Sequence, residues 1–307
     1  MPYFLGIDTS NYTTSCAIYN SDTDKVIHRK RLLPVKNGEL GLRQSDAVFH
    51  HTVQLPQLME ELFDGFDGEI EAIGVSDAPV RAKGSYMPCF LTGVCAAQSI
   101  AAATGKPLYR FSHQQDHIMA ALYSADRREL YGTDFFAFHV SGGTTQALLV
   151  SGELDTRLIA SSLDLKAGQA VDRVGVMLGY PFPAGKYVDE LAQKSEKRYK
   201  INIKLKEGNC CLSGVENKCK AMLENGEKPE DICRYCLDYI MTALYKIAVY
   251  AKENYGELPM IFSGGVMSNS IIRAEFEEKL GAGFAEPEFS ADNAAGIALL
   301  AAKRSLK

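Results

Sequence analysis

The sequence predicts a duplicated α/β fold with two lobes, and one repeated pattern is the main reason. Twice in the chain, a short apolar strand leads into a small polar turn and then into a second apolar strand, which is typical of a β-hairpin. Helical patterns separate the two hairpins, as expected if each hairpin opens one lobe and turns toward a shared cleft. The strands are 4–8 and 15–19 around the turn 9–14, and 135–140 and 147–150 around the turn 141–146.

The other elements follow from periodicity and local composition. Apolar spacing predicts helices, and Pro56 should lie in the first turn of its helix or kink it. Short apolar runs predict further strands. The expected helices are 52–63, 91–104, 113–124, 231–251, 268–280 and 291–306, and the expected strands are 70–75, 107–111 and 259–262.

The length of 307 residues predicts about two domains. We place the N-terminal lobe at 1–110 and the C-terminal lobe at 111–292. The last helix, 293–307, is expected to pack back on the N-terminal lobe. No Pro/Ser-rich linker separates the lobes, which predicts that they are closely joined.

The composition excludes several classes of protein. With 46% hydrophobic and 23% charged residues, the chain is neither disordered nor fibrous. The net charge of −5 means that a nucleic-acid partner would need a local basic patch. The most apolar run, Leu91 to Thr104, is too short to cross a bilayer, so no membrane partner is expected. The sequence shows no signal peptide, and a core of this size does not need disulfides between its eight cysteines. We therefore expect a cytoplasmic protein with free thiols.

Two histidines lie four residues apart in a predicted helix, at positions His113 and His117. This spacing puts both imidazoles on one face, where they could bind one metal ion. Asp292 is a candidate for the third ligand. The alternatives are two surface histidines and an aspartate that caps a helix.

Two glycine-rich turns follow strands, at Ser141–Thr144 and at Ser263–Gly265. Glycine allows backbone N–H groups to approach a phosphate or nucleotide. Together with Gly168, Gly179 and Gly185 around Asp172, they favour a nucleotide site, although tight turns also use glycine.

Cys233 and Cys236 form a Cys-x-x-Cys pair that could hold structural zinc, but a predicted helix makes buried free thiols the favoured interpretation. The segment from Lys194 to Lys206 carries six basic residues and one Glu. It could contact RNA phosphates or form a solvated surface.

Seven motifs together resemble, in order and spacing, the TsaD-type tRNA threonylcarbamoyladenosine synthases, once called glycoproteases (peptidase family M22). The resemblance covers nearly the whole chain and implies the ASKHA fold of actin, hexokinase and Hsp70. The motifs are Gly6–Ser10, His113-x-x-x-His117, Val140–Gly143, Gly168–Arg173, Ser213-Gly214, Ser263–Val266 with Asn269, and Ala291–Asn293.

The resemblance implies transfer of a threonylcarbamoyl group from threonylcarbamoyl-AMP to N6 of the adenine next to the tRNA anticodon. It implies one divalent metal, zinc or iron, held by His113, His117 and Asp292. An adenine nucleotide or the adenylate would bind the two turns and the residues near them. That set is His139, Val140, Ser141, Gly142, Gly143, Asp172, Gly185, Gly264, Gly265 and Asn269. No catalytic residue is assigned, and Asp8 and Ser10 are the nearest candidates.

The chain also departs from the family and resembles a divergent paralogue. The family's Thr-Ser-Cys-Asp-Glu-Thr turn is here Thr9–Thr14, so both acids are missing. Ala78–Arg81 replaces Gly-Pro-Gly-Leu, Thr144 replaces a histidine, and Ala184–Lys186 replaces Gly-Gly-Pro.

Two functions therefore compete. The first is threonylcarbamoyl transfer to tRNA or a related carbamoyl-type transfer, and the second is a non-catalytic nucleotide- or metal-binding partner that regulates an authentic TsaD-type enzyme. The N-terminal lobe would bind a TsaB-like subunit or a second copy of the chain. A metalloprotease is disfavoured, because no Glu follows His113 to act as a base.

Overall fold

The computed structural model describes residues 2–10, 12–34 and 42–307, so Asn11 of the first turn lies outside the described residues. The chain forms two compact units. Unit 1 comprises Met1–Arg128 and Ala291–Lys307, and unit 2 comprises Glu129–Ser290. The boundary follows residue 128 rather than residue 110, because helix α3 (His113–Ser124) packs against helix α10 (Ala295–Ser305) of unit 1.

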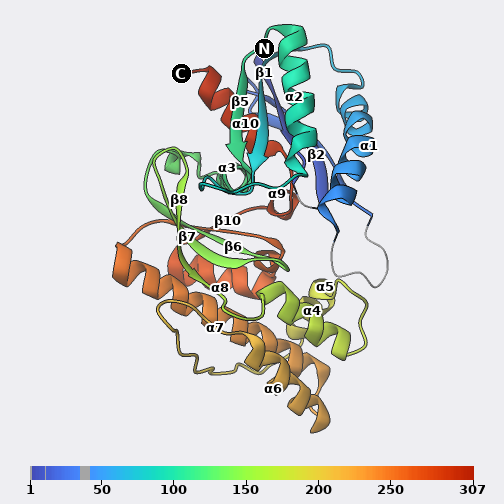
Figure 1. Ribbon diagram of the computed structural model, residues 1–307. Coiled ribbons are helices and arrows are strands. Elements are labelled where there is room, and N and C mark those ends of the chain that lie inside the picture. Colours follow the sequence, from blue (N-terminus) through green and yellow to red (C-terminus); the bar gives the residue numbers. More distant parts are fainter. Residues whose placement is uncertain (1, 11, 35–41) are drawn as a thin grey trace. The chain divides into compact units, whose positions relative to one another are not determined.

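Each unit contains a five-stranded sheet with the same strand order (Figure 1). In unit 1 the order is β3-β2-β1-β4-β5, and in unit 2 it is β8-β7-β6-β9-β10. In both, the first three strands are antiparallel and the last two run parallel to the first. The predicted duplication is therefore confirmed. The strands are β1 (Pro2–Asp8), β2 (Thr13–Asn20), β3 (Lys25–Leu32), β4 (Glu69–Ala78), β5 (Leu108–Ser112), β6 (Phe135–Val140), β7 (Thr145–Ser151), β8 (Asp155–Ser161), β9 (Met260–Ser263) and β10 (Gly283–Phe284).

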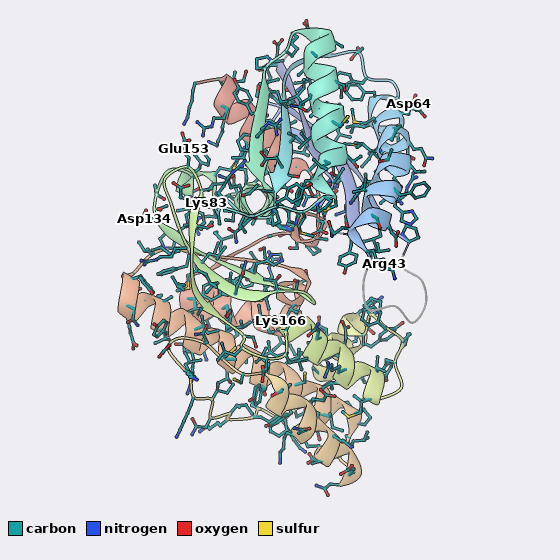
Figure 2. All side chains as sticks on the ribbon, in the orientation of Figure 1. Arg43, Asp64, Lys83, Asp134, Glu153 and Lys166 are labelled. Carbon is teal, nitrogen blue, oxygen red and sulfur yellow. The ribbon has the colours of Figure 1, made fainter. Side chains whose placement is uncertain are left out.

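Helices cover the sheets, and apolar side chains fill the space between them (Figure 2). In unit 1, α1 (Gln44–Phe63) and α2 (Phe90–Thr104) pack on one face, and α3 and α10 pack on the other. The helices of unit 2 are α4 (Ala167–Met177), α5 (Gly185–Ala192), α6 (Ser213–Glu224), α7 (Pro229–Tyr255), α8 (Ser270–Leu280) and α9 (Pro287–Ser290). Within the described ranges, no helix is both long and apolar enough to cross a membrane.

Glycines allow α10 to lie unusually close to its neighbours. A Cβ at Gly6 of β1 would meet the carbonyl oxygen of Ala294 at 2.5 Å, and one at Gly296 would meet that of Asp116 at 2.1 Å. Neither distance is tolerated between real atoms, so these positions require glycine. The close packing fixes the start of α10, and with it Asp292, beside β1 and α3.

Several elements differ from the prediction. Helix α1 begins at Gln44 rather than at residue 52, so Pro56 lies inside the helix. Strand β3 was not predicted, because its many charged residues hide the apolar alternation. Helix α10 begins at Ala295 with Ala294 as its N-cap, so the alternative that Asp292 caps the last helix is wrong.

Candidate functional sites

Two histidines and one aspartate of unit 1 meet at the start of α3. His113 and His117 occupy the first two turns of this helix, whose N-terminus is closed by a capping box between Ser112 and Gln115. The Nε2 atoms of the two histidines are 2.9 Å apart. Oδ1 of Asp292 lies 3.7 Å from Nε2 of His113 and 3.4 Å from Nε2 of His117.

These three atoms fit a single metal ion. The three distances form a triangle, and a point close to its plane lies about 2 Å from each atom, as in Zn–N and Zn–O bonds. Imidazole nitrogens and a carboxylate oxygen are also ligands that zinc and iron accept. Three protein ligands would leave further coordination positions for a substrate.

The carboxylate of Asp8 lies next to Nδ1 of His113. Side chains alternate along a strand, and the register that pairs Ile7 with Val75 places Asp8 beside Ser76. Asp8 is fully buried and accepts hydrogen bonds from the hydroxyls of Ser10 and Ser76. Its Oδ2 lies 3.2 Å from Nδ1 of His113. A carboxylate at that nitrogen orients an imidazole whose other nitrogen binds a metal. Asp8 therefore lies next to His113, Ser10 lies next to Asp8, and neither side chain reaches solvent.

Asp116 was missed by the sequence analysis, although it lies between the two histidines. It is fully buried, and its Oδ1 accepts a hydrogen bond of 2.8 Å from the backbone N of Ile297. Its Oδ2 is buried without a hydrogen-bond partner. Oxygens of Asp8 and Asp116 and a nitrogen of His113 all lie within 4.8 Å of one another. A buried carboxylate oxygen without a donor fits a site that a cation completes.

The charges around the histidines favour a cation. Burial alone would lower the pKa of His113, but Asp8, Asp292 and Asp116 raise it to about 9. Burial alone would raise the pKa of Asp292, yet His117, His113 and a hydrogen bond from Thr13 hold it well below its usual value. The pKa of Asp116 is raised well above its usual range by burial and by the nearby Asp8. Positive charge at His113 is therefore stabilised by the neighbouring carboxylates.

Thr13 connects the metal cluster with the first hairpin. Its side chain is buried at the start of β2 and forms a hydrogen bond with Asp292. In the family's turn this position carries the second acid. The substitution therefore replaces a carboxylate next to the candidate metal site with a neutral hydroxyl.

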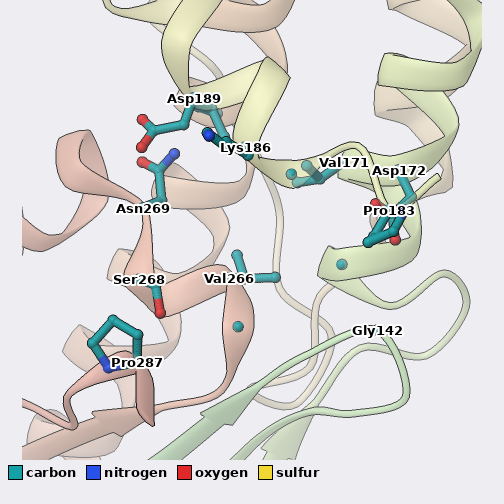
Figure 3. A pocket seen from close by; sticks show the side chains of 14 residues that line it. Gly142, Val171, Asp172, Pro183, Lys186, Asp189, Val266, Ser268, Asn269 and Pro287 are labelled. Atoms are coloured by element: carbon teal, nitrogen blue, oxygen red, sulfur yellow. The ribbon is translucent and has the colours of Figure 1, made fainter. Parts of the chain in front are cut away.

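Unit 2 contains a cavity of about 630 Å³ (Figure 3). This volume is typical of sites for small molecules and cofactors. Five of the predicted nucleotide residues line it, namely Gly142, Asp172, Gly185, Gly265 and Asn269. His139, Val140, Ser141, Gly143 and Gly264 are not among the lining residues, and Val140 is fully buried.

Glycines shape the wall of this cavity. A Cβ at Gly168, near the start of α4, would lie 2.5 Å from the backbone N of Gly142. Gly264 has φ +97°, and a Cβ there would lie 2.3 Å from the carbonyl oxygen of Val140. The two glycine-rich turns and the start of α4 can therefore approach one another, which exposes backbone on the cavity wall.

Polar side chains enter the cavity from α4, α5 and the start of α8 (Figure 3). Oδ1 of Asp172 accepts a hydrogen bond of 2.8 Å from the backbone N of Ala184. Oδ1 of Asn269 caps α8 by accepting from Ile271 and Ile272. Lys186 and Asp189 of α5 also line the cavity and were not predicted.

The cysteine pair does not form a metal site in the described part of the chain. Cys233 and Cys236 are buried in α7. The two clusters of metal-ligand type among the described residues consist of histidines and aspartates and include neither cysteine. Burial raises the pKa of Cys233 to about 12, which keeps it a thiol. The interpretation as buried free thiols fits this environment.

Comparison with solved structures defines the fold class. Component A of (R)-2-hydroxyglutaryl-CoA dehydratase from Acidaminococcus fermentans matches with a TM-score of 0.59 and 18% identity over 100% of both chains. The HypF structure from T. kodakarensis matches with a TM-score of 0.62 and 12% identity, over 99% of this chain and 47% of HypF. The chain has the duplicated α/β ASKHA fold.

The family follows from sequence comparison. The family model described as "TsaD: tRNA N6-adenosine threonylcarbamoyltransferase" matches residues 36–299. The protein of that name from Bacillus licheniformis is 30% identical over 90% of this chain and 82% of its own length. The one from Chloroherpeton thalassium is 31% identical over 97% of this chain and 90% of its own. The chain belongs to the TsaD family.

Proposed function

We propose that this chain transfers a threonylcarbamoyl group from threonylcarbamoyl-AMP to N6 of the adenine next to the tRNA anticodon. The observation that carries the proposal is the cluster of His113, His117 and Asp292, which is arranged for one metal ion in a chain of the TsaD family. The test is incubation of the metal-loaded protein with threonylcarbamoyl-AMP and unmodified tRNA, followed by mass spectrometry of the nucleosides. Absence of the modified adenosine at any enzyme concentration would refute the proposal.

The proposed metal is one divalent ion, zinc or iron. When bound, it would polarise an acyl oxygen and fix the acyl group. The chain's own residues have separate tasks. Oδ2 of Asp8 lies 3.2 Å from Nδ1 of His113, so a proton on Nδ1 would face this carboxylate and leave Nε2 as the ligand atom. Asp292 and the two imidazoles leave one side of the cluster for substrate.

The proposed nucleotide site is the cavity of unit 2. One oxygen of Asp172 is held by the backbone of Ala184, so the other remains available to a ribose diol. The amide nitrogen of Asn269 remains available because its oxygen caps α8. Backbone N–H groups of the glycine-rich turns would bind the phosphate leaving group.

We expect Asp172→Ala to weaken adenylate binding by about tenfold or more, since hydrogen bonds to a charged group contribute about 1.5–3 kcal/mol. Calorimetry with AMP, ATP and a non-hydrolysable threonylcarbamoyl-AMP analogue measures this. Asp189→Ala is the matched control, because Asp189 lines the same cavity but bonds to Ser270. Unchanged affinity in Asp172→Ala would remove Asp172 from the site.

The second candidate function is a non-catalytic partner that binds nucleotide or metal and regulates an authentic TsaD-type enzyme. The neutral Thr13 beside Asp292 favours it, because an acid of the family is missing at that point. This function predicts nucleotide and metal binding without transfer. Adding the chain to an authentic enzyme would then change that enzyme's rate.

We further propose that unit 1 binds a TsaB-like subunit or a second copy of the chain. Phe49 and Val53 of α1 and Leu91 of α2 are 64%, 46% and 51% exposed. The two helices are adjacent there, since the hydroxyls of Thr52 and Thr92 are 3.4 Å apart. Such neighbouring apolar side chains are typical of interfaces.

We expect light scattering after size exclusion to show a dimer or a complex with a TsaB-like subunit. Phe49→Asp should abolish that association, because it buries a charge in the contact. The control is Tyr86→Asp, because Tyr86 is also exposed and apolar but lies outside α1 and α2. If the wild-type chain is a monomer both alone and in the presence of a TsaB-like subunit, the proposed interface is contradicted.

A further inference from the structure

The segment 194–206 lies along α7 and is joined to it by hydrogen bonds and an ion pair at several positions. The hydroxyl of Ser195 donates to Asp231 at 2.6 Å, and Lys197 pairs with the same carboxylate at 2.8 Å. The backbone N of Tyr199 donates to Asp238 at 2.8 Å. Lys246 donates to the carbonyl oxygen of Ile203.

These contacts show that the segment is nearly extended. From residue 231 to residue 246, α7 rises about 22 Å at 1.5 Å per residue. The segment covers this length between residues 195 and 203. Since an extended chain spans at most about 3.3–3.6 Å per residue, or about 26–29 Å over these eight steps, the segment uses most of its possible length.

In an extended chain, side chains alternate between two faces, and burial follows this alternation. Tyr199, Ile201, Ile203 and Leu205 pack against the core of unit 2. The residues between them are all exposed and polar, and four of them are cations: Arg198, Lys200, Lys204 and Lys206, with Asn202 in the middle. We call these four cations the basic strip.

The cations of the basic strip form no ion pair with the described residues, although the charge of Arg198 acts to lower the pKa of the buried Asp238. No carboxylate of the described residues lies within 4 Å of any of its four cations. The nearest acids in the sequence are Glu196 and Glu207, outside its two ends. In a chain with a net charge of −5, this is a local concentration of positive charge. Alternate positions along the strip are about 7 Å apart, which is comparable to the distance between successive phosphates of a nucleic-acid strand.

We propose that the basic strip binds the phosphate backbone of RNA. The strip presents two pairs of cations, Arg198 with Lys200 and Lys204 with Lys206, on one face of an extended segment. Such a row of cations suits a polyanion, and each cation bound to a phosphate releases a counterion. The chain that leads into the strip starts close to the cavity, since Gln193, five residues before Arg198, donates to Ser270, the residue after Asn269. The inference rests on the proposed function only for the choice of tRNA as the RNA.

The test is fluorescence anisotropy with an unmodified tRNA transcript at several salt concentrations, without metal or adenylate. In the variant Arg198→Gln/Lys200→Gln/Lys204→Gln/Lys206→Gln, the slope of log affinity against log salt should fall by about 3, at about 0.7–0.9 for each lost phosphate contact. At low salt the affinity should fall about ten- to a thousandfold. All four side chains are exposed, so the fold should not change.

The matched control removes the same charge elsewhere, in Lys25→Gln/Lys218→Gln/Lys220→Gln/Lys228→Gln, where all four lysines are also exposed. Its salt slope should stay within about 1 of the wild type. The proposal is overturned if the wild type does not bind tRNA, if both variants lose the same slope, or if poly-glutamate binds the strip as tightly as tRNA. Strip-dependent binding by a protein that does not transfer would refute only the proposed function.

Discussion

The variant His113→Ala/His117→Ala should contain no bound metal, whereas the wild type should contain about one zinc or iron ion per chain. Two of the three ligand atoms are lost, and the remaining carboxylate of Asp292 cannot hold a transition metal alone. Elemental analysis of protein purified without added metal measures this, and transfer to tRNA should be lost with the ion.

The control for this experiment is His50→Ala, which removes a histidine of α1 that belongs to neither metal-ligand cluster. It should keep the metal. If stoichiometric metal survives in the double variant, the site lies elsewhere in the chain. The Cys233 and Cys236 pair would then need to be examined again.

Restoring the family's acids in Tyr12→Asp/Thr13→Glu should accelerate transfer to tRNA by about 10²–10⁴-fold, the usual contribution of a positioned general base. Thr13 already contacts Asp292, so a carboxylate introduced there would lie at the metal cluster. A single-turnover assay with enzyme in excess over threonylcarbamoyl-AMP measures the rate of the chemical step.

The control here is Tyr12→Asn/Thr13→Gln, which has the same shape without the charge and should not accelerate transfer. Adenylate binding should be unchanged in both variants, because Asp172 and Asn269 belong to unit 2. If the wild type already transfers as fast as the Bacillus licheniformis relative, the acids are dispensable and the interpretation as a divergent paralogue loses its basis.

Much of the fold could be predicted from local sequence. The bounds of α3 agree with the prediction because the helix follows Ser112, a good N-cap that forms a capping box with Gln115. Strand β3 could not be recognised, since Lys25, Arg29, Lys30 and Arg31 occupy an edge strand where charged side chains remain in water.

The candidate metal site was only partly predictable. The spacing of His113 and His117 is a local signal, but the roles of Asp8 and Asp116 depend on which strands pair and on how closely α10 approaches. The lining of the cavity was also only partly predictable from the sequence. Lys186 and Asp189 look like ordinary surface residues of the amphipathic helix α5, and only tertiary packing turns them toward the cavity.

Unit 1 is assembled from both ends of the chain, which has a consequence for synthesis on the ribosome. Residues 129–290 are continuous and can fold as soon as they emerge. The first sheet is made earlier, but Asp292 and the helix that covers its β1 and β4 strands are made only after unit 2. His113 and His117 are therefore synthesised long before their third partner. A nascent chain would acquire a tightly held ion only after residue 292 has been made, so chains interrupted before that residue should not sequester metal.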